Sequence, residues 1–350
     1  QHREGLERYF ETGQSRILGR RLELPALHAN GTEFPVELAI TRIAANGPPM
    51  FTAYLRDITE HRRTEQRRAI RLAATHVLNV AAGRDDGASG ILQAVCENLG
   101  WDVGYFWTVN HSETALVCAQ GWHRSDLTVT EFEAATFGRT FEMGEGLPGH
   151  VWSTGRPHWL LDVLVEAGFP RAASAAMYDL HSAFACPVVV GDRTLGVIEF
   201  FTKRIQEPDA DLLEMMGTVA GNFGQFLERK QSEERVRQSE QELADFFDNA
   251  TIGLHWVGPD GRILRANRAE LELLGYRREE YVGRSVADFH ADEEVIRDIL
   301  ERLRAGEELH EYPARLRCKD GSIKHVLIGS SALFRDGEFV HTRWFTQDVT

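Results

Sequence analysis

The sequence is poor in cysteine and lacks long apolar runs. Its 350 residues include 4 cysteines, which form no Cys-x-x-Cys pair and have no histidine beside them at zinc-ligand spacing. We therefore predict a reducing compartment, the cytoplasm, and no metal site. No apolar run approaches the roughly 18 residues of a membrane-spanning helix, and no signal peptide is present. We expect no membrane contact in this chain.

Basic charge is also scarce. The chain carries 39 Lys and Arg residues against 53 Asp and Glu residues, a formal net charge of −14. This balance argues against a nucleic-acid partner, because a nucleic-acid-binding surface concentrates basic side chains. The hydrophobic share of 43% is ordinary for a globular protein, and the length predicts two or three domains. The chain begins at Gln1 without a methionine and ends at Thr350, so we expect a piece of a longer protein.

Recognisable catalytic patterns are missing as well. No Ser-His-Asp or Cys-His arrangement stands out, and the acidic residues fit solvated helix faces better than a pair of catalytic carboxylates. Residues 144–149 match Gly-x-Gly-x-x-Gly, but Pro148 removes a backbone donor that a phosphate-binding loop needs. We interpret this stretch as a structural turn. The sequence therefore predicts no catalytic residue within the chain.

The most informative stretch that is present spans residues 209–249. Its apolar residues recur at steps of four and three in the first half and thin out amid alternating charge in the second. They are Leu212, Met216, Val219, Phe223 and Phe226, followed by Val236, Leu243 and Phe247. This pattern predicts one long helix. Its first half should close a globular unit, and its second half should be a solvated rod paired with a second copy of itself.

Three glycines lie in the first half of this helix, at Gly217, Gly221 and Gly224. Each costs about 1 kcal/mol of helix stability relative to alanine, so a packing reason is expected. Small residues let two helices approach closely. We expect this face to meet the helix near residues 72–80, or the same helix of a partner chain in a homodimer.

Strands and helices alternate through the rest of the chain. Alternating apolar and polar residues between turn signals predict strands, and periods of three and four predict helices. Strands are expected over 21–28, 33–43, 50–57, 102–109, 115–121, 184–190, 194–201, 252–257 and 262–266, with three more at the end. Helices are expected over 91–99, 268–274 and 293–305, and a helical linker over 61–71. The long stretch 128–181 holds loops that can enclose a small molecule.

The two ends of the chain repeat one another. HANGTEFPVEL, from His28, aligns with CKDGSIKHVLI, from Cys318, and after one inserted residue LRDIT aligns with TQDVT. Gly31 thereby pairs with Gly321, and Asp57 with Asp348. Two copies of one supersecondary unit predict a domain that is used twice, with the front half missing from the first copy.

These motifs resemble known families. FDNATIG (247–253), PDGRI (259–263), the run 266–285 and the closing Asp-Val-Thr resemble a PAS domain, while GEGLPGHVWSTGRPHWLLDV (144–163) and ACPVVVGDRTLGVIEFF (185–201) resemble a GAF domain. The resemblance implies an α+β fold with antiparallel five- to six-stranded sheets, flanking helices and long connecting helices. The implied parts are a partial PAS domain (1–60), a linker (61–71), a GAF domain (72–228), a coiled-coil-like linker (229–245) and a PAS domain (246–350).

The PAS resemblance implies a ligand pocket and a relay. A five-stranded sheet covered by short helices leaves a small apolar cavity, which Trp256, Phe289, Leu303 and Cys318 are expected to line; plain core packing is the alternative. The closing Asp-x-Thr motifs are expected to pass the signal to the next helix. Asp57 and Asp348 should close the last strands, and Thr59 and Thr350 should accept backbone N–H bonds at the helix start.

No cofactor is assigned by the sequence. His2, followed by GLERYFETGQSRILG (5–19), resembles the haem-ligating helix of PAS domains in bacterial oxygen sensors, and imidazole is a suitable donor for haem iron. A surface histidine without haem is the alternative. ATP would be needed only by a catalytic domain outside this chain.

The amino-acid sequence of the last segment resembles those of PAS domains that lie just ahead of the kinase core in bacterial sensor histidine kinases. This likeness implies the ligand-binding input region of a two-component system, a histidine kinase parent and a response regulator as its partner. Two alternatives remain: the input region of a cyclic-di-GMP cyclase or phosphodiesterase, and a PAS/GAF interaction scaffold without enzyme activity.

Overall fold

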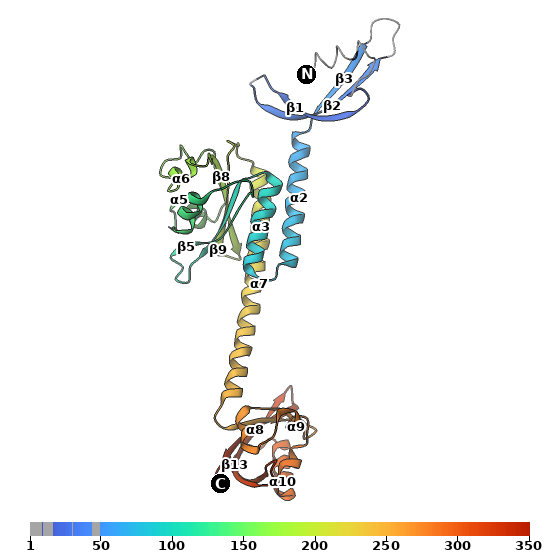
Figure 1. Ribbon diagram of the computed structural model, residues 1–350, viewed down its shortest axis with the longest axis vertical. Helices are drawn as coiled ribbons and strands as arrows, with labels where there is room; N and C mark the ends of the chain where they lie inside the picture. The colour runs from blue at the N-terminus through green and yellow to red at the C-terminus, as the bar shows by residue number, and fades with distance from the viewer. Residues whose placement is uncertain (1–8, 10–16, 30, 44–49) are drawn as a thin grey trace. The chain divides into compact units, whose positions relative to one another are not determined.

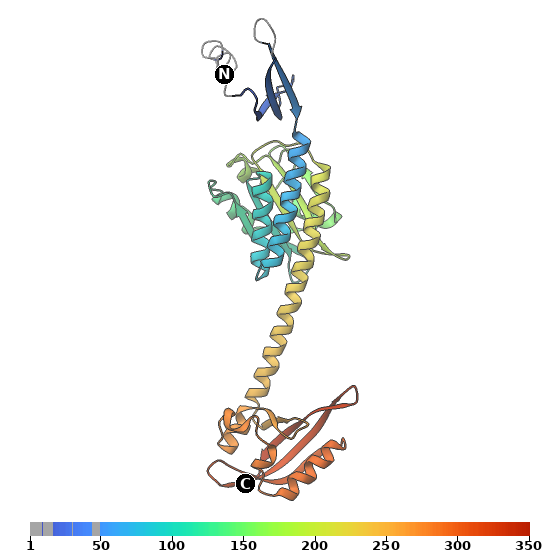
Figure 2. The ribbon, with the colours of Figure 1, turned by 90° about the vertical axis from the view of Figure 1, so that its right-hand side faces the viewer.

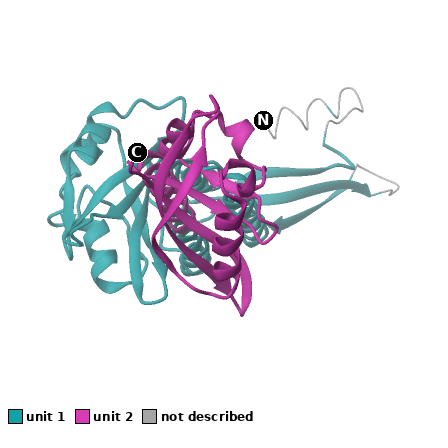
Figure 3. Cartoon of the chain, turned by 90° about the horizontal axis from the view of Figure 1, so that it is seen from below, with its two compact units in different colours: residues 1–231 teal, residues 232–350 magenta. Residues whose placement is uncertain are grey.

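The computed structural model describes residues 9, 17–29, 31–43 and 50–350. His2 and most of the run 5–19, which resembles a haem-ligating helix, lie outside these residues. The chain divides into two compact units, Gln1–Gln231 and Ser232–Thr350 (Figure 3). Among the described residues, no helix is both long enough and apolar enough to cross a membrane.

Unit 1 starts with a three-stranded antiparallel sheet in the order β1-β2-β3. Its strands are β1 (Arg21–Leu27), β2 (Glu33–Ile43) and β3 (Met50–Asp57), and helix α2 (Thr59–Val80) follows after one residue. All three strands agree with the sequence prediction. The helix is longer than the predicted connector, because the buried apolar stripe that includes Ile70 continues beyond position 71 with Ala74 and Leu78.

The rest of unit 1 is a six-stranded antiparallel sheet covered on both faces (Figure 1). The strand order is β6-β5-β4-β9-β8-β7. The strands are β4 (Val103–Val109), β5 (Ala115–His123), β6 (Thr140–Glu142), β7 (His158–Leu160), β8 (Ser182–Val190) and β9 (Arg193–Thr202). The helices are α3 (Arg84–Leu99), α4 (Thr130–Phe137), α5 (Gly146–Thr154), α6 (Ala172–Ala176) and α7 (Ala210–Asn249). Figure 2 shows α2, α3 and the first half of α7 side by side over one face.

The period of two along the strands divides the core of this sheet into two layers. In β9, Ile198 and Phe200 pack towards α2, α3 and α7, whereas Val197 and Phe201 pack into the layer that contains α4, α5 and α6. Successive side chains of a strand point to opposite faces, so this alternation is what a sheet buried on both sides requires. Glu199 is two residues from both Val197 and Phe201, so it lies on the same face of β9 and points into the second layer.

Helix α7 is one continuous helix of 40 residues. Its residues in unit 1 bury Leu212, Met216, Val219, Phe223 and Phe226, as the sequence pattern predicted. Its residues in unit 2 are mostly exposed, with Val236 57% and Leu243 66% exposed. The predicted division into a packed half and a solvated half is confirmed.

The reason expected for one glycine of α7 is wrong. A Cβ at Gly224 would lie 2.9 Å from Val190 Cγ2 and 3.0 Å from the Val189 carbonyl oxygen. The glycine is needed because the helix crosses closely over β8 rather than over another helix. A Cβ at Gly217 or Gly221 would meet nothing within 4 Å. Packing of these two against a second chain stays a prediction.

Unit 2 is a five-stranded antiparallel sheet in the order β11-β10-β14-β13-β12 with helices over one face. The strands are β10 (Gly253–Val257), β11 (Ile263–Ala266), β12 (Leu309–Arg317), β13 (Ile323–Arg335) and β14 (Glu338–Asp348). The helices are α8 (Arg268–Leu274), α9 (Arg278–Tyr281), the 3₁₀ turn η1 (Val286–Phe289) and α10 (Glu293–Arg304). The predicted α+β class, with antiparallel five- and six-stranded sheets and flanking helices, is confirmed.

The predicted repeat is visible in the backbone. In the first copy Val36 pairs with Asp57 across β2 and β3, and in the second Val326 pairs with Asp348 across β13 and β14. Gly31 and Gly321 occupy equivalent turns with φ of 86° and 87°, a conformation that favours glycine. The same register and the same turn therefore occur at both ends of the chain.

Candidate functional site

The predicted pocket residues of unit 2 fall on two faces of its sheet. Phe289, Leu303 and Cys318 are buried in one apolar cluster beneath the helices. Trp256 is not part of that interior, because neighbouring residues of β10 point to opposite faces and His255 takes the inner side. Trp256 instead stacks on His341, with ring centroids 4.7 Å apart. Its predicted place in the cavity is wrong.

The interior of unit 2 contains a buried carboxylate and imidazole. Glu270 on α8 is 0% exposed and His255 on β10 is 2% exposed. Glu270 Oε1 lies 3.0 Å from His255 Nδ1 and accepts a hydrogen bond of 2.8 Å from the Tyr281 hydroxyl. Burial raises the pKa of a carboxyl, but His255 and Tyr281 more than offset this, so the Glu270 pKa is below its usual value.

His290 extends this polar cluster towards the sheet. It follows η1, is 7% exposed, and its ring centroid lies 6.1 Å from that of Trp344. Burial, together with the nearby His255, lowers the pKa of His290 to about 4. Neither His255 Nε2 nor His290 Nδ1 has a hydrogen-bond partner among the described residues. Unsatisfied buried nitrogens are costly, so this cluster is where a small polar molecule would gain hydrogen bonds.

Unit 1 contains a second buried carboxylate, in the layer beneath α4, α5 and α6. Glu199 on β9 receives a 2.6 Å hydrogen bond from Arg171 Nη2 and one of 3.1 Å from Trp107 Nε1. The side chains of Arg171 and Glu199 are 1% and 0% exposed. Arg171 Nη1 also donates to Thr136 Oγ1 at 3.2 Å. A charged pair this deep in a core persists only when its hydrogen bonds are well formed.

The two Asp-x-Thr motifs place their carboxylates at the ends of β3 and β14, as predicted. Asp57 Oδ1 accepts the Thr59 amide at 2.8 Å, and Asp348 Oδ1 accepts the Thr350 amide at 2.9 Å. The N-cap residue of α2 is Ile58, whose side chain accepts no hydrogen bond, and the role of Thr59 as an acceptor stays a prediction. The carboxylate of Asp57 satisfies the first helical amide.

The two Asp-x-Thr motifs differ in the further contacts that their side chains make. Lys324 Nζ lies 2.6 Å from Asp348 Oδ2 and is the main cause that lowers the pKa of Asp348 to about 2. Thr350 Oγ1 accepts the amide of His325 at 3.0 Å. The hydroxyl of Thr350 therefore ties the chain end to β13, a role that the sequence did not suggest.

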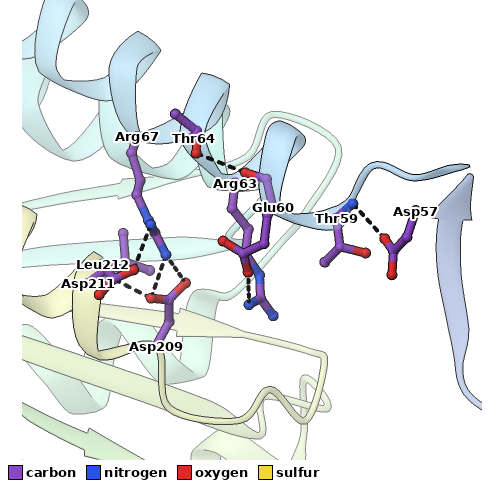
Figure 4. A network of polar contacts seen from close by, with 9 residues as sticks. All are labelled: Asp57, Thr59, Glu60, Arg63, Thr64, Arg67, Asp209, Asp211 and Leu212. Atoms are coloured by element: carbon purple, nitrogen blue, oxygen red, sulfur yellow. Dashed lines mark hydrogen bonds and ion pairs between the residues drawn. The ribbon is translucent and has the colours of Figure 1, made fainter. Parts of the chain in front are cut away.

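Helix α2 is clamped to the start of α7 by an arginine (Figure 4). Arg67 Nη2 lies 2.8 and 2.9 Å from the two carboxylate oxygens of Asp209, and Arg67 Nη1 lies 3.0 Å from Asp211 Oδ2. Asp209 Oδ1 also accepts the Leu212 amide at 2.9 Å. One carboxylate therefore satisfies the N-terminus of α7 and also pairs with α2.

A surface hollow of about 520 Å³ lies beside α8 in unit 2, lined in part by Arg268 and Arg278. Arg278 pairs with Asp248 at 3.2 Å, and Arg268 donates to Asn249 Oδ1 at 2.8 Å. Both arginines of this hollow already have partners, so the hollow offers little to an anionic ligand. Among the described residues, no group of three His, Cys, Asp or Glu side chains is arranged to hold a metal ion.

Sequence reasoning missed both buried carboxylates, which it assigned to solvated faces. A signal existed for Glu199, because it is the single charged residue in the apolar run Leu195–Phe201 of a strand. A charge in a strand buried on both faces needs a partner. No comparable signal marks Arg171 or Glu270.

Comparison with known families assigns these folds. A sequence model of the GAF domain matches residues 81–228, and one of the PAS domain matches residues 1–60 and 249–350. These matches confirm the predicted PAS and GAF resemblance. The repeat at the two chain ends falls within the PAS matches.

Related sequences include two that are named as sensors. The sensor protein FixL of Bradyrhizobium diazoefficiens is 32% identical over 82 residues, covering 23% of this chain and 16% of that protein. The methyl sulfide methyltransferase-associated sensor of Methanosarcina acetivorans is 26% identical over 148 residues, or 41% of this chain and 15% of that protein. An uncharacterised protein of Azorhizobium caulinodans is 35% identical over 109 residues, or 28% and 15%. The chain thus matches less than a fifth of these relatives' length.

Similar solved structures include a GAF domain from a phosphoenolpyruvate-protein phosphotransferase of Coxiella burnetii. It is 16% identical with a TM-score of 0.42, over 49% of this chain and 98% of that one. A PAS domain of an HTR-like protein from Haloarcula marismortui is 24% identical with a TM-score of 0.31, over 34% and 99%. From the family matches, the chain is built of PAS and GAF domains, with the GAF domain between the two PAS segments.

Proposed function

We propose that this chain is the signal-sensing and relay region of a cytoplasmic sensor histidine kinase. A small ligand or partner binds a PAS or GAF domain, and the connecting helices carry the change to a kinase core in the parent protein. The observation that carries this proposal is α7, a continuous helix that is packed into the GAF core in one half and exposed in the other. A helix of this kind can transmit a rotation or a shift that a flexible loop would absorb.

The contacts at the helix starts support the relay. Asp57 holds the first amide of α2, and Arg67 of α2 holds the carboxylate that satisfies the first turn of α7. A change in the first PAS segment therefore meets α2 at its first amide, and α2 in turn contacts the start of α7 through Arg67. The relatives named as sensors agree with an input role.

The ligand-binding part of the proposal rests on the buried clusters. The PAS interior holds imidazole nitrogens without partners, and the GAF interior holds a charged pair. Both are enclosed between a sheet and short helices, where ligand pockets commonly form. Haem at His2 remains the earlier expectation and involves none of the described residues.

The parent protein gives the decisive experiment. The natural full-length protein is incubated with radiolabelled ATP, and we expect a label that is acid-labile and base-stable, as phosphohistidine is. Transfer of the label to the aspartate of a response regulator should follow. Conversion of GTP to a cyclic dinucleotide without labelling would instead favour the cyclase alternative, and absence of any activity would favour the scaffold.

The relay is tested in the same assay with a matched pair of variants. Arg67→Ala removes the clamp between α2 and α7, whereas Arg63→Ala removes an exposed contact to Glu60 on the same helix. We expect the first to change the autophosphorylation rate and the second to leave it near that of the unaltered protein. Equal rates in all three proteins would contradict a relay through Arg67.

The proposed homodimer through the linker helices has its own matched pair. Gly221→Leu places a side chain where nothing in the chain lies within 4 Å, while Gly224→Leu drives it into Val190. We expect Gly221→Leu to weaken dimerisation without unfolding the GAF domain, and Gly224→Leu to destabilise the domain. An unchanged sedimentation coefficient of Gly221→Leu at low concentration would argue against this dimer face.

A further inference from the structure

The GAF core encloses a guanidinium group in a cage of aromatic rings. Arg171 Cζ lies 5.1 to 5.5 Å from the ring centroids of five aromatic side chains. They are Trp107, Phe132, Phe141, Phe169 and Phe201. The carboxylate of Glu199 closes the cage with the 2.6 Å hydrogen bond to Arg171 Nη2. Aromatic walls with one carboxylate are the arrangement that recognises organic cations.

The carboxylate belongs to the scaffold, whereas the cation does not. Glu199 and Trp107 lie on β9 and β4, adjacent strands of the six-stranded sheet. Arg171 comes from the covering segment 161–181, whose regular structure is limited to α6, a helix of five residues. The sheet therefore presents the carboxylate and three of the five rings, on β4, β6 and β9, and the covering segment supplies the charge that neutralises the carboxylate.

The pairing within the cage is incomplete. Arg171 Nε is buried and has no hydrogen-bond partner among the described residues. A guanidinium group has five N–H donors, and a buried donor without an acceptor costs free energy. The cage thus fits a guanidinium group without having every donor of Arg171 satisfied.

The covering segment is held at its ends by contacts that water can reach. His181 lies 3.1 Å from Asp162 and 3.2 Å from Asp179, and Asp179 is 77% exposed. Its surface also carries exposed apolar side chains, with Val165 80% and Met177 63% exposed. The His181–Asp179 pair is exposed and contributes little stability. The buried side chains Val163, Ala175 and Leu180, each 0% exposed, are therefore the main contacts that movement of the segment has to break.

We propose that the GAF cage is a binding site for a small guanidinium compound, and that Arg171 occupies it as an internal stand-in for that ligand. The ligand's guanidinium group pairs with Glu199 and lies among the four rings outside segment 161–181, those of Trp107, Phe132, Phe141 and Phe201. Arg171 then leaves the cage, and the segment 161–181 moves with it. This inference rests on the proposed sensory function and names the ligand class of its GAF domain.

The first experiment uses the unaltered 350-residue chain. Ethylguanidinium is titrated to 50 mM, with ethylurea, its neutral isostere, as the control and with sodium chloride matching ionic strength. We expect saturable binding of ethylguanidinium alone, together with faster amide hydrogen exchange in segment 161–181. No binding of ethylguanidinium, or equal effects of the two compounds, would overturn the proposal.

The second experiment empties the cage. In Arg171→Ala, ethylguanidinium should bind at least tenfold more tightly than in the unaltered chain, because the internal competitor is gone. At about 100 times its dissociation constant it should raise the melting temperature by about 5 °C or more. Ethylurea should not do so, and adding Glu199→Gln should weaken the binding about 10- to 100-fold.

Failure of Arg171→Ala to fold would leave the decision to the unaltered chain. Binding to Arg171→Ala without any binding to the unaltered chain would mean that Arg171 is a permanent structural partner, and would overturn the proposal. The autophosphorylation of the parent protein is measured separately. A kinase that is active but does not respond to guanidinium compounds would refute this ligand class while leaving the proposed function intact.

Discussion

The GAF and PAS domains each bury one carboxylate completely, and they neutralise it in different ways. Glu199 faces Arg171, whose guanidinium group stays charged over the whole pH range in which proteins fold. Glu270 faces His255 and the Tyr281 hydroxyl, with His290 nearby. Histidine is the side chain whose charge changes near neutral pH. The charge balance of the GAF pair therefore depends only on the positions of its side chains. The charge balance of the PAS cluster depends both on the positions of its side chains and on whether its histidines carry a proton.

The largest effect is expected from breaking the GAF pair. Arg171→Ala leaves Glu199 charged and buried without its cation, which should cost about 3–5 kcal/mol of unfolding free energy. The measurement is urea unfolding followed by the fluorescence of the buried tryptophans. Arg139→Ala is the control, because its contact with Glu145 is 3.4 Å long and exposed and should contribute about 0.5 kcal/mol or less. Similar losses in both variants would contradict the comparison.

The next effect is the pH dependence of the PAS domain. The pKa of His290 is lowered to about 4, so between the unfolded histidine pKa near 6.5 and pH 4 the unfolded chain binds a proton that the folded chain does not. Stability is therefore present above about pH 6.5 and falls by up to about 3 kcal/mol as the pH drops to 4. The lowered pKa of Glu270 adds a loss in the same direction at still lower pH.

Hydrogen exchange of amides in β13 and β14 measures this dependence within the PAS domain. His290→Gln should flatten the profile between pH 6.5 and 4.5. His310→Gln is the control, since the His310 side chain is 83% exposed, and it should keep the slope of the unaltered chain. A slope that survives in His290→Gln would assign the pH dependence to another group.

A smaller effect is expected where the carboxylate is only partly buried. The side chains of Arg67 and Asp209 are 18% and 20% exposed, so their pair extends the comparison towards the surface. Arg67→Ala should cost about 1 kcal/mol, and Arg63→Ala about 0.3 kcal/mol. Thermal unfolding of the GAF domain gives both values. If both variants lost the same unfolding free energy, burial would not determine how much these ion pairs stabilise the domain.

The smallest effect is expected at the exposed end of the series. Asp57 holds the Thr59 amide and has its pKa lowered by hydrogen bonds from Thr59. Asp57→Ala should raise the exchange rate of the first amides of α2 several-fold, while Thr59→Ser should change it little. The rates are read by hydrogen exchange with mass spectrometry. If the amides exchanged faster in Thr59→Ser than in Asp57→Ala, then Thr59 rather than Asp57 would be the residue that caps α2.

The sequence predicted elements well where the period of apolar residues is regular. The strands of the first PAS segment, α8 and the two halves of α7 follow from local spacing alone. Arg171 and Glu199 are 28 residues apart in the chain, and His255 and Glu270 are 15 apart. Only the paired strands and the covering helices bring them together, so local patterns could not reveal these pairs. The prediction for Trp256 fails for a smaller reason: His255 takes the inner face of β10, so the next residue points to the outer face.

The exposed half of α7 also bears on how such proteins change over evolutionary time. Each residue turns an α-helix by about 100°, so an insertion of two residues rotates everything that follows by about 200°. An insertion of seven restores the original orientation to within about 20°. Val236 and Leu243 are themselves seven residues apart and exposed. Natural relatives should therefore differ in the length of this stretch mainly by multiples of seven residues, and exchange of whole domains between proteins should succeed at the same steps.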